Sequence, residues 1–298
     1  MRIGYPCLNR SIGCSPAHTF RLASYSDERL KETVTANLSC LAEILTYNVF
    51  HGLFFFRITS DLVPFASHPS CTFPWQKHFS REFRRIGKYI RDHRLRISMH
   101  PDQFVLLNSP NPDILERSIA DLRYQVQILD LMELDSSAKV QIHVGGVYRD
   151  KPAAIDRFVN AYDLLGDPVR KRLVIENDER LYSVSDCLAI HERTGIPVLL
   201  DVFHHSVNNN HERIPDLLGP VQASWKKHDG IPMVDYSSQQ PGRRAGAHAE
   251  SIDPEDFRSF LNASIRFDLD IMLEIKDKEK SALSALSIAQ NDPRLYRT

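Results

Sequence analysis

The stretch RISMHPDQF, residues 96–104, has the pattern of a short buried strand that ends on a histidine. His100 is followed at once by Pro101, so the strand stops where a metal-binding side chain stands. One such ending has little meaning alone, because packing accounts for many strand-end histidines. The pattern becomes informative only if the other strands of the chain also end on imidazole or carboxylate side chains.

Short apolar or β-branched runs recur along the chain, and longer amphipathic stretches separate them. Leu30, Val34, Leu38, Leu41 and Leu45 are three or four positions apart, which puts one apolar stripe on a helix. Strands that alternate with helices over a chain of this length predict an α/β fold, a (β/α)8 TIM barrel with its active site at the C-terminal ends of the strands. Eight strand-like runs can be counted, at residues 2–6, 53–59, 95–100, 140–144, 172–177, 198–203, 233–237 and 271–275.

A doubly wound open sheet is the competing architecture. It is disfavoured because no glycine-rich phosphate loop follows the first run, and GYPC (residues 4–7) does not resemble one. The chain also has no low-complexity segment, no Gly/Ser linker and no abrupt change in composition. We therefore expect a single barrel domain over residues 1–298.

Composition and charge limit the possible functions. The chain is 42% hydrophobic and 25% charged, so its 298 residues can bury a substantial core. The formal net charge of -1 gives no bulk attraction to DNA, so a polyanionic partner must be held by a local cluster or by bound cations. The first residues, MRIGYPCLNR, are too polar for a signal peptide, and no apolar run approaches the roughly 20 residues of a membrane span. We expect a cytoplasmic protein without a membrane partner.

Cysteine usage indicates neither a disulfide framework nor a thiolate zinc site. The number is odd and no CxxC pair occurs. We expect reduced, partly buried thiols at all five positions, which are Cys7, Cys14, Cys40, Cys71 and Cys187.

Metal-binding side chains do follow the other predicted strands. So many imidazoles and carboxylates at one barrel mouth would repel each other and lose solvation unless cations compensate them. Ligands that are all nitrogen or oxygen suit Mn, Zn or Fe, and nine are too many for a single ion, so two or three divalent ions are expected. The nine candidates are His68, His100, His143, Glu176, Asp201, His204, Asp235, His248 and Glu274.

The sequence resembles the UV damage endonucleases, which share a barrel superfamily with abasic-site endonucleases and xylose isomerases. The resemblance covers nearly the whole chain and implies a DNA repair enzyme that nicks the strand immediately 5′ to cyclobutane dimers, (6-4) photoproducts and some other lesions. It also implies a metal cluster, usually of manganese, on the candidates above other than Asp235, with Zn²⁺, Mg²⁺ or Co²⁺ as alternatives. The segments that carry it are GYPC, RITSDLVPFASHP, SMHPDQF, IHVGGVY, ENDERLYSV, LLDVFHH, GAHAE and LEIKDKE.

One segment departs from that pattern. Many relatives have a lysine and a histidine two residues apart in the seventh strand, where this chain has Met233 and Asp235. A carboxylated lysine is impossible at Met233, whereas Asp235 can replace the imidazole as an oxygen ligand. We expect a working cluster with altered metal preference.

The chemistry expected of this cluster is phosphodiester hydrolysis, with Glu176, Glu274 and Asp201 as the catalytic carboxylates. The expected partner is double-stranded DNA that carries UV lesions, bound by a monomer. Flipping a damaged dinucleotide costs less than flipping an intact one, which supplies selectivity. The resemblance implies lesion contacts by Tyr5, Gln103 and Phe104, and position makes two cations candidate phosphate contacts, Arg57 and Lys276.

Two other functions remain open at this point. A sugar isomerase of the same superfamily would convert aldoses to ketoses and ignore DNA. A lesion-binding protein that does not cut would hold damaged DNA, an alternative that rests only on Met233 and Asp235.

Overall fold

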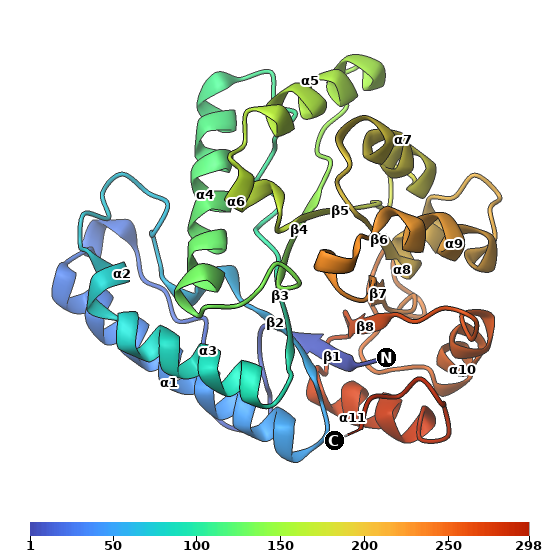
Figure 1. Ribbon diagram of the computed structural model, residues 1–298, viewed down its shortest axis with the longest axis horizontal. Helices are drawn as coiled ribbons and strands as arrows, with labels where there is room; N and C mark the ends of the chain where they lie inside the picture. The colour runs from blue at the N-terminus through green and yellow to red at the C-terminus, as the bar shows by residue number, and fades with distance from the viewer. Residues whose placement is uncertain (298) are drawn as a thin grey trace.

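Eight short parallel strands close into a barrel in the computed structural model of the chain, which describes residues 1–297. Each strand pairs with the next one along the chain, and the last pairs with the first to close the ring. Figure 1 shows the strands at the centre with the helices around them, as the alternating sequence pattern predicts. The strands are β1 (Ile3–Pro6), β2 (Phe55–Ile58), β3 (Arg96–Met99), β4 (Lys139–His143), β5 (Leu173–Glu176), β6 (Val198–Asp201), β7 (Met233–Tyr236) and β8 (Asp270–Leu273).

The helices cover the outer face of the barrel with their apolar stripes. The first long helix buries all five leucine and valine positions of the predicted stripe, and Ser26 caps its first turn by accepting a hydrogen bond from Arg29 N at 3.2 Å. The helices are α1 (Asp27–Phe50), α2 (Trp75–His78), α3 (Ser80–Asp92), α4 (Pro112–Leu131), α5 (Lys151–Asp163), α6 (Asp167–Arg170), α7 (Val184–Thr194), α8 (Val202–Val207), α9 (Ile214–Ser224), α10 (Pro254–Ala263) and α11 (Glu279–Ile288).

The interior of the barrel is layered. Side chains of a strand alternate between its two faces, so residues two apart point the same way. An apolar cluster holds the residues that lie two positions before the polar groups of β2, β5, β6, β7 and β8. An apolar layer of side chains therefore lies beneath a polar layer, which is at the C-terminal end of the barrel. Met233 belongs to the apolar layer. The members of the apolar cluster are Phe55, Val174, Leu199, Trp225, Met233 and Met272.

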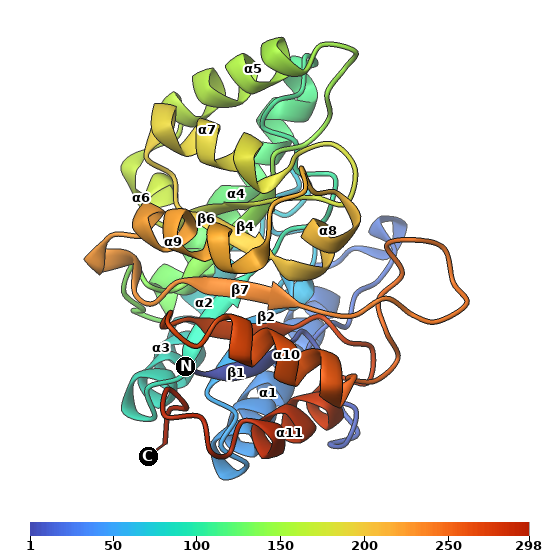
Figure 2. The same cartoon turned by 90° about the vertical axis from the view of Figure 1, so that its right-hand side faces the viewer.

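The loops at the C-terminal ends of the strands gather on one side of the molecule. In Figure 2 the β7 arrow points toward the long loop that precedes α10, while both chain termini lie toward the opposite end. Most strands differ from the predicted runs by one or two residues at an end, and at β6 the last two predicted residues, 202–203, belong to α8 because the strand stops at Asp201. The reason is that the Asp201 side chain accepts a hydrogen bond from His204 N at 2.7 Å, which caps α8 and ends the strand.

The prediction of five reduced cysteines is wrong. Cys14, in the loop after β1, forms a disulfide with Cys40 on α1. The two residues are 26 positions apart in a pattern that no motif marks, so only the packing of the loop against the helix brings them together. Cys7, Cys71 and Cys187 are free thiols.

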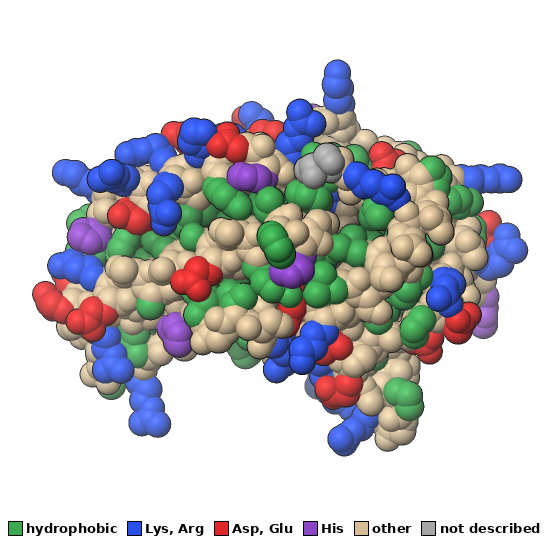
Figure 3. Space-filling view, turned by 90° about the horizontal axis from the view of Figure 1, so that it is seen from below, with side chains coloured by type: hydrophobic (Ala, Val, Ile, Leu, Met, Phe, Trp, Pro, Cys, Tyr) green, Lys and Arg blue, Asp and Glu red, His purple; other side chains and the backbone are tan. Residues whose placement is uncertain are grey.

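Surface charge is mixed. On the face drawn in Figure 3, Lys and Arg side chains project around the margin and Asp and Glu side chains lie among them, in keeping with the net charge of -1. Among the described residues, every helix is too short or too polar to cross a bilayer. Because the net charge is close to zero, a polyanion would depend on local charged groups for its binding. Charged side chains converge at the mouth of the barrel.

Candidate active site

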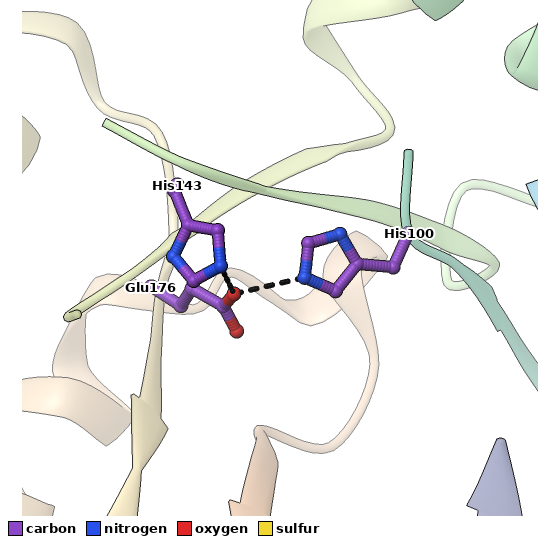
Figure 4. A group of neighbouring side chains, drawn as sticks. All are labelled: His100, His143 and Glu176. Carbon is purple, nitrogen blue, oxygen red and sulfur yellow. Dashed lines mark hydrogen bonds and ion pairs between the residues drawn. The ribbon is translucent and has the colours of Figure 1, made fainter. Parts of the chain in front are cut away.

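Two imidazoles converge on one carboxylate oxygen at the mouth of the barrel. Nε2 of His100 and Nε2 of His143 each lie 2.9 Å from an oxygen of Glu176, Oε1 in both cases, and Figure 4 shows both rings pointing toward it. The parallel pairing of β4 with β5 sets His143 directly beside Glu176, and His100 follows β3 on the other side. Neighbouring strand ends thus assemble a cluster from residues far apart in sequence.

Burial and charge shift the pKa values of this cluster. Burial alone would lower the pKa of His143, but the Glu176 carboxylate outweighs it and raises the pKa to about 9. Glu176 is 1% exposed, and burial would raise its pKa, yet the imidazoles of His143 and His100 hold that pKa well below the usual value. The Glu176 carboxylate is therefore ionised, and the His143 imidazole, with its raised pKa, acts as a cation beside it.

Asp201 and His204 form a second pair, set by the start of α8. Nδ1 of His204 lies 3.1 Å from Oδ2 of Asp201, a contact that follows from the spacing of three residues at the end of β6. Burial raises the pKa of Asp201 to about 7, with Glu274 and Glu176 adding to the rise and His204 opposing it. This carboxyl group can therefore gain or lose a proton near neutral pH.

Arg57 and Gln141 connect the carboxylates below the mouth. Nη2 of Arg57 lies 2.7 Å from both oxygens of Asp235 and 2.7 Å from Oε1 of Gln141. Arg57 Nη1 also donates to Glu274, and the amide of Gln141 donates to Glu176 and Asp235. Asp235 is fully buried, and burial raises the pKa of its carboxyl group well above the usual value while Arg57 opposes the rise. Any charge on Asp235 is therefore compensated within the protein rather than by solvent.

His248 extends the row of imidazoles along the mouth. Its Nδ1 lies 2.8 Å from the backbone oxygen of Glu274 and donates to it, which leaves Nε2 with the lone pair that a metal ion needs. That Nε2 lies 3.9 Å from Oε2 of Glu274. Successive ring centroids are 5.3 Å apart from His100 to His143, 5.8 Å from His143 to His204 and 6.0 Å from His204 to His248.

Glu274 closes the site on the side of β8. Burial would raise the pKa of its carboxyl group, but the Arg57 guanidinium outweighs burial and holds the pKa at about 2. Glu274 is therefore ionised across the physiological range, as a metal ligand must be.

These residues fit divalent metal ions. Two groups bring ligand atoms within 4.8 Å of one another, His100 with His143 and Glu176, and Glu176 with Asp201 and Asp235. The second group holds three buried carboxylates, which repel each other unless a cation lies among them. Asp235 already has Arg57 as such a cation, so the other ligands have the greater need of a metal. The donor set is nitrogen and oxygen alone, as Mn and Zn sites accept.

A cavity of about 1010 Å³ opens over the cluster. His100, His143, His248 and Glu274 line it together with basic and aromatic residues from the surrounding loops. Phe104, in the loop after β3, is 74% exposed, so its ring is open to a ligand in the cavity. The rim residues include Gln103, Phe104, Arg244, Lys276 and Lys278.

Three predicted residues lie outside the cluster or are already paired within the protein. His68 is exposed in the loop after β2, where Nδ1 accepts a hydrogen bond from Ser70 N, and it stays outside the cluster. Tyr5 is fully buried between the barrel and α1, because odd positions of β1 face outward toward the helices. Its hydroxyl group donates a hydrogen bond to Asn48 and accepts one from Asn9. Arg57 lines the cavity, but its guanidinium is already paired with Asp235 and Glu274. In this structure His68 therefore stands apart from the cluster, Tyr5 has no exposed surface, and the charge of Arg57 is compensated by carboxylates.

Two residues of the site were missed in the sequence. Gln141 lies two positions before His143 on the same face of β4, so strand alternation could have pointed to it. Lys278 follows Glu274 by four positions inside the quoted segment LEIKDKE, but nothing in the sequence distinguishes it from Lys276.

The closed ring of eight parallel strands, with an imidazole and carboxylate cluster at its mouth, defines a TIM barrel with a candidate metal centre. Endonuclease IV from Thermus thermophilus has this fold, with a TM-score of 0.58 and 18% identity over 84% of this chain and 93% of that one. D-psicose 3-epimerase from Clostridium cellulolyticum is similar with a TM-score of 0.56 and 11% identity, over 84% of this chain and 93% of the other. At these identities the likeness shows the fold alone.

The chain belongs to the UV DNA damage endonuclease family. The family model described as UV-endonuclease UvdE matches residues 1–292. The UV DNA damage endonuclease of Clostridium perfringens (strain 13 / Type A) is 35% identical over 289 residues, covering 96% of this chain and 70% of the relative. That of Bacillus thuringiensis subsp. konkukian is 34% identical over 293 residues, covering 95% and 92%. The crystal structure of SacUVDE matches with a TM-score of 0.94 and 44% identity over 98% of both chains.

Proposed function

We propose that this chain is a metal-dependent endonuclease that cuts DNA immediately 5′ to cyclobutane pyrimidine dimers, (6-4) photoproducts and some other lesions, and so begins excision repair. The products would be a 3′-hydroxyl and a 5′-phosphate. The observation that carries the proposal is the convergence of His100 and His143 on Glu176 at 2.9 Å, at the floor of a cavity wide enough for a nucleotide.

Two or three divalent ions, Mn²⁺ before Zn²⁺, Mg²⁺ or Co²⁺, would lower the pKa of a water molecule and stabilise the departing 3′ oxygen. The ligands we propose are His100, His143, Glu176, Asp201, His204, His248 and Glu274, with Asp235 as a weaker candidate.

Each of the three carboxylates would have a different role in the reaction. Glu176, ionised and fixed by two imidazoles and by Gln141, would hold its orientation throughout. Asp201, which accepts a hydrogen bond from His204 N at 2.7 Å and belongs to the second ligand group, would be one of the carboxylates that hold an ion near the attacking water. Glu274, held at the barrel rim by Arg57, lines the cavity on the side of β8 and would act beside the leaving group.

Selectivity for damaged DNA would come from the rim. Gln103 and Phe104 line the cavity on the side of β3, and a ring with 74% of its surface exposed can stack on a base or fill the gap left by a flipped one. Lys276 is exposed but pairs with Glu250 at 2.6 Å, so a phosphate would have to compete with that carboxylate.

A nicking assay tests the proposal. A duplex with one thymine dimer is incubated with the protein and Mn²⁺, with and without chelator, beside the undamaged duplex. We expect one nick 5′ to the dimer that depends on metal, and loss of nicking in Glu176→Gln. Glu255→Gln is the matched control, because Glu255 is an exposed residue of α10 outside the cavity. Intact damaged DNA after treatment with loaded wild-type protein would refute the proposal.

The alternatives give different outcomes in the same assay. A sugar isomerase would leave both duplexes intact and convert an aldose to a ketose. A lesion-binding protein would retard the damaged duplex in a gel without nicking it. The family and the wide mouth of the cavity favour cleavage, with cellular DNA as the substrate, and we propose a monomer that acts in the cytoplasm.

A further inference from the structure

Lys278 has a backbone conformation that L residues rarely adopt. It stands in the turn between β8 and α11, with φ at 59° and ψ at -117°. In this region the Cβ atom meets the backbone, so only glycine adopts it without strain. Strained residues persist where the surrounding structure holds them, and they concentrate at functional sites.

The neighbouring residue fixes the turn. Glu279 is fully buried, and its carboxylate accepts hydrogen bonds from Arg10 N at 2.8 Å and from the Ser11 hydroxyl at 2.7 Å. These bonds join the first turn of α11 to the loop after β1. The hydrogen bonds of Glu279 explain why the turn has this backbone conformation. They do not explain why position 278 is a lysine, because a glycine there would allow the same turn without strain.

The side chain of Lys278 faces the candidate active site. It lines the cavity together with Cys7, Arg57 and Glu274, at the seam where β8 meets β1. Lys276 pairs with Glu250 at 2.6 Å, whereas Nζ of Lys278 has no hydrogen-bond or ion-pair partner within residues 1–297. Arg57, the other cation on this side, is already bound to Asp235 and Glu274.

We propose that Lys278 binds a phosphodiester oxygen of the DNA strand at the position of cleavage. The inference rests on the proposed function, since it assumes that DNA enters the cavity. Lys278 lines the same cavity as Glu274, and an ammonium group without an ion-pair partner within residues 1–297 offers the positive charge that a phosphate needs there. The turn fixes the backbone from which the lysine extends, so only the side chain has to become ordered when the strand binds.

Binding without cleavage tests the contact directly. Affinity for the thymine-dimer duplex is measured by fluorescence anisotropy in chelator at several salt concentrations. Lys278→Gln should reduce the slope of log K against log salt by about 1, as expected for one lost phosphate contact. Lys278→Arg should keep the slope. Lys280→Gln is the matched control, because Lys280 is exposed on α11 and lies outside the cavity.

Nicking and stability add two independent readouts. With Mn²⁺, Lys278→Gln should lower kcat by roughly 100-fold, the usual effect of losing one group that stabilises developing charge, and Lys278→Arg should recover part of it. Lys278→Gly should keep or raise Tm because it relieves the strain, whereas Lys280→Gly should lower Tm because it weakens the helix.

The results separate the two proposals. Wild-type protein that fails to nick would remove the proposed function, while the salt slopes still decide whether Lys278 contacts phosphate. If the wild type nicks and Lys278→Gln has the same kcat and the same slope, Lys278 has no role in DNA binding. A fall in Tm for Lys278→Gly as large as for Lys280→Gly would remove the argument from strain.

Discussion

Arg57 and Asp235 form an ion pair in the barrel interior, with Nη2 of the arginine 2.7 Å from Oδ2 of the aspartate and both side chains almost without exposure. The pair joins β2 to β7, although its two residues are 178 positions apart in sequence. Asp235 stands where many relatives are expected to have a histidine, so the pair replaces a neutral ring with a charge that the protein itself compensates. Its first consequence concerns stability.

Removal of Asp235 should destabilise the fold. Asp235→Ala leaves the Arg57 guanidinium with one carboxylate partner in a buried position, which should cost about 3 kcal/mol. Urea unfolding of the metal-free protein measures the loss. Asp216→Ala, on the exposed surface of α9, should leave the free energy of unfolding nearly unchanged. An effect of Asp235→Ala as small as that of the control would show that the pair contributes nothing.

Metal ions should raise the stability of the folded protein through Glu176. A ligand present at 100 times its Kd stabilises the native state by about 2.7 kcal/mol, so added Mn²⁺ should raise Tm. The rise should disappear in Glu176→Gln, because Glu176 belongs to both candidate ligand groups. Calorimetry with and without chelator provides the measurement. A variant that keeps the full rise in Tm would exclude Glu176 as a ligand.

Metal-free protein should lose stability as pH rises. The Glu176 carboxylate raises the pKa of His143 to about 9, so this imidazole contributes fully below its unfolded pKa of about 6.5 and the contribution is lost as pH approaches 9. The change should be on the order of 3 kcal/mol. Burial raises the pKa of Asp201 to about 7, which lowers stability in the same direction between about pH 4 and 7. Chemical unfolding in chelator at pH 6.5 and 9 should show the full loss in wild type and a smaller one in His143→Gln, where His204, whose pKa Asp201 raises against burial, still contributes.

Reduction of the disulfide should lower stability. The bond between Cys14 and Cys40 spans 26 residues, and a loop of this length corresponds to about 3 kcal/mol. Disulfides are rare in the reducing cytosol, so the stability of the chain should depend on its redox environment. Tm with and without reductant, compared with Cys14→Ser, gives the test, and Cys71→Ser serves as control. Equal Tm values for reduced and oxidised wild type would contradict the expectation.

Phe104 should act on DNA and not on the fold. Loss of one stacked base contact costs about 1–3 kcal/mol, so Phe104→Ala should weaken binding of the damaged duplex by roughly 5- to 150-fold. Because the ring is 74% exposed, Tm should stay the same. Phe50→Ala, at a position 84% exposed on α1, is the matched control for removal of a surface ring. Equal affinities of the two variants would eliminate the stacking role.

The barrel and most of its mouth were predictable because both follow from local periodicity. Strand alternation fixes which side chains point inward, and parallel strands bring their C-terminal ends to one rim. His100, His143 and Glu176 could therefore be placed together from sequence alone, and the structure brings each imidazole to 2.9 Å from Glu176.

The remaining features depend on tertiary packing. His68 lies in a long irregular loop after β2, whose course no periodic pattern defines. The Cys14 and Cys40 pair and the contact of Arg57 with Asp235 join segments that local rules treat as independent. The strain at Lys278 is a property of backbone angles, which the sequence LEIKDKE does not reveal because lysine is not a residue that marks such a turn.

Each catalytic candidate is delivered by a different strand of a ring that closes only when β8 meets β1. A chain emerging from the ribosome has His100 and His143 long before it has Glu274, and an open ring cannot hold the three in register. The site would therefore be assembled only once the whole ring has folded.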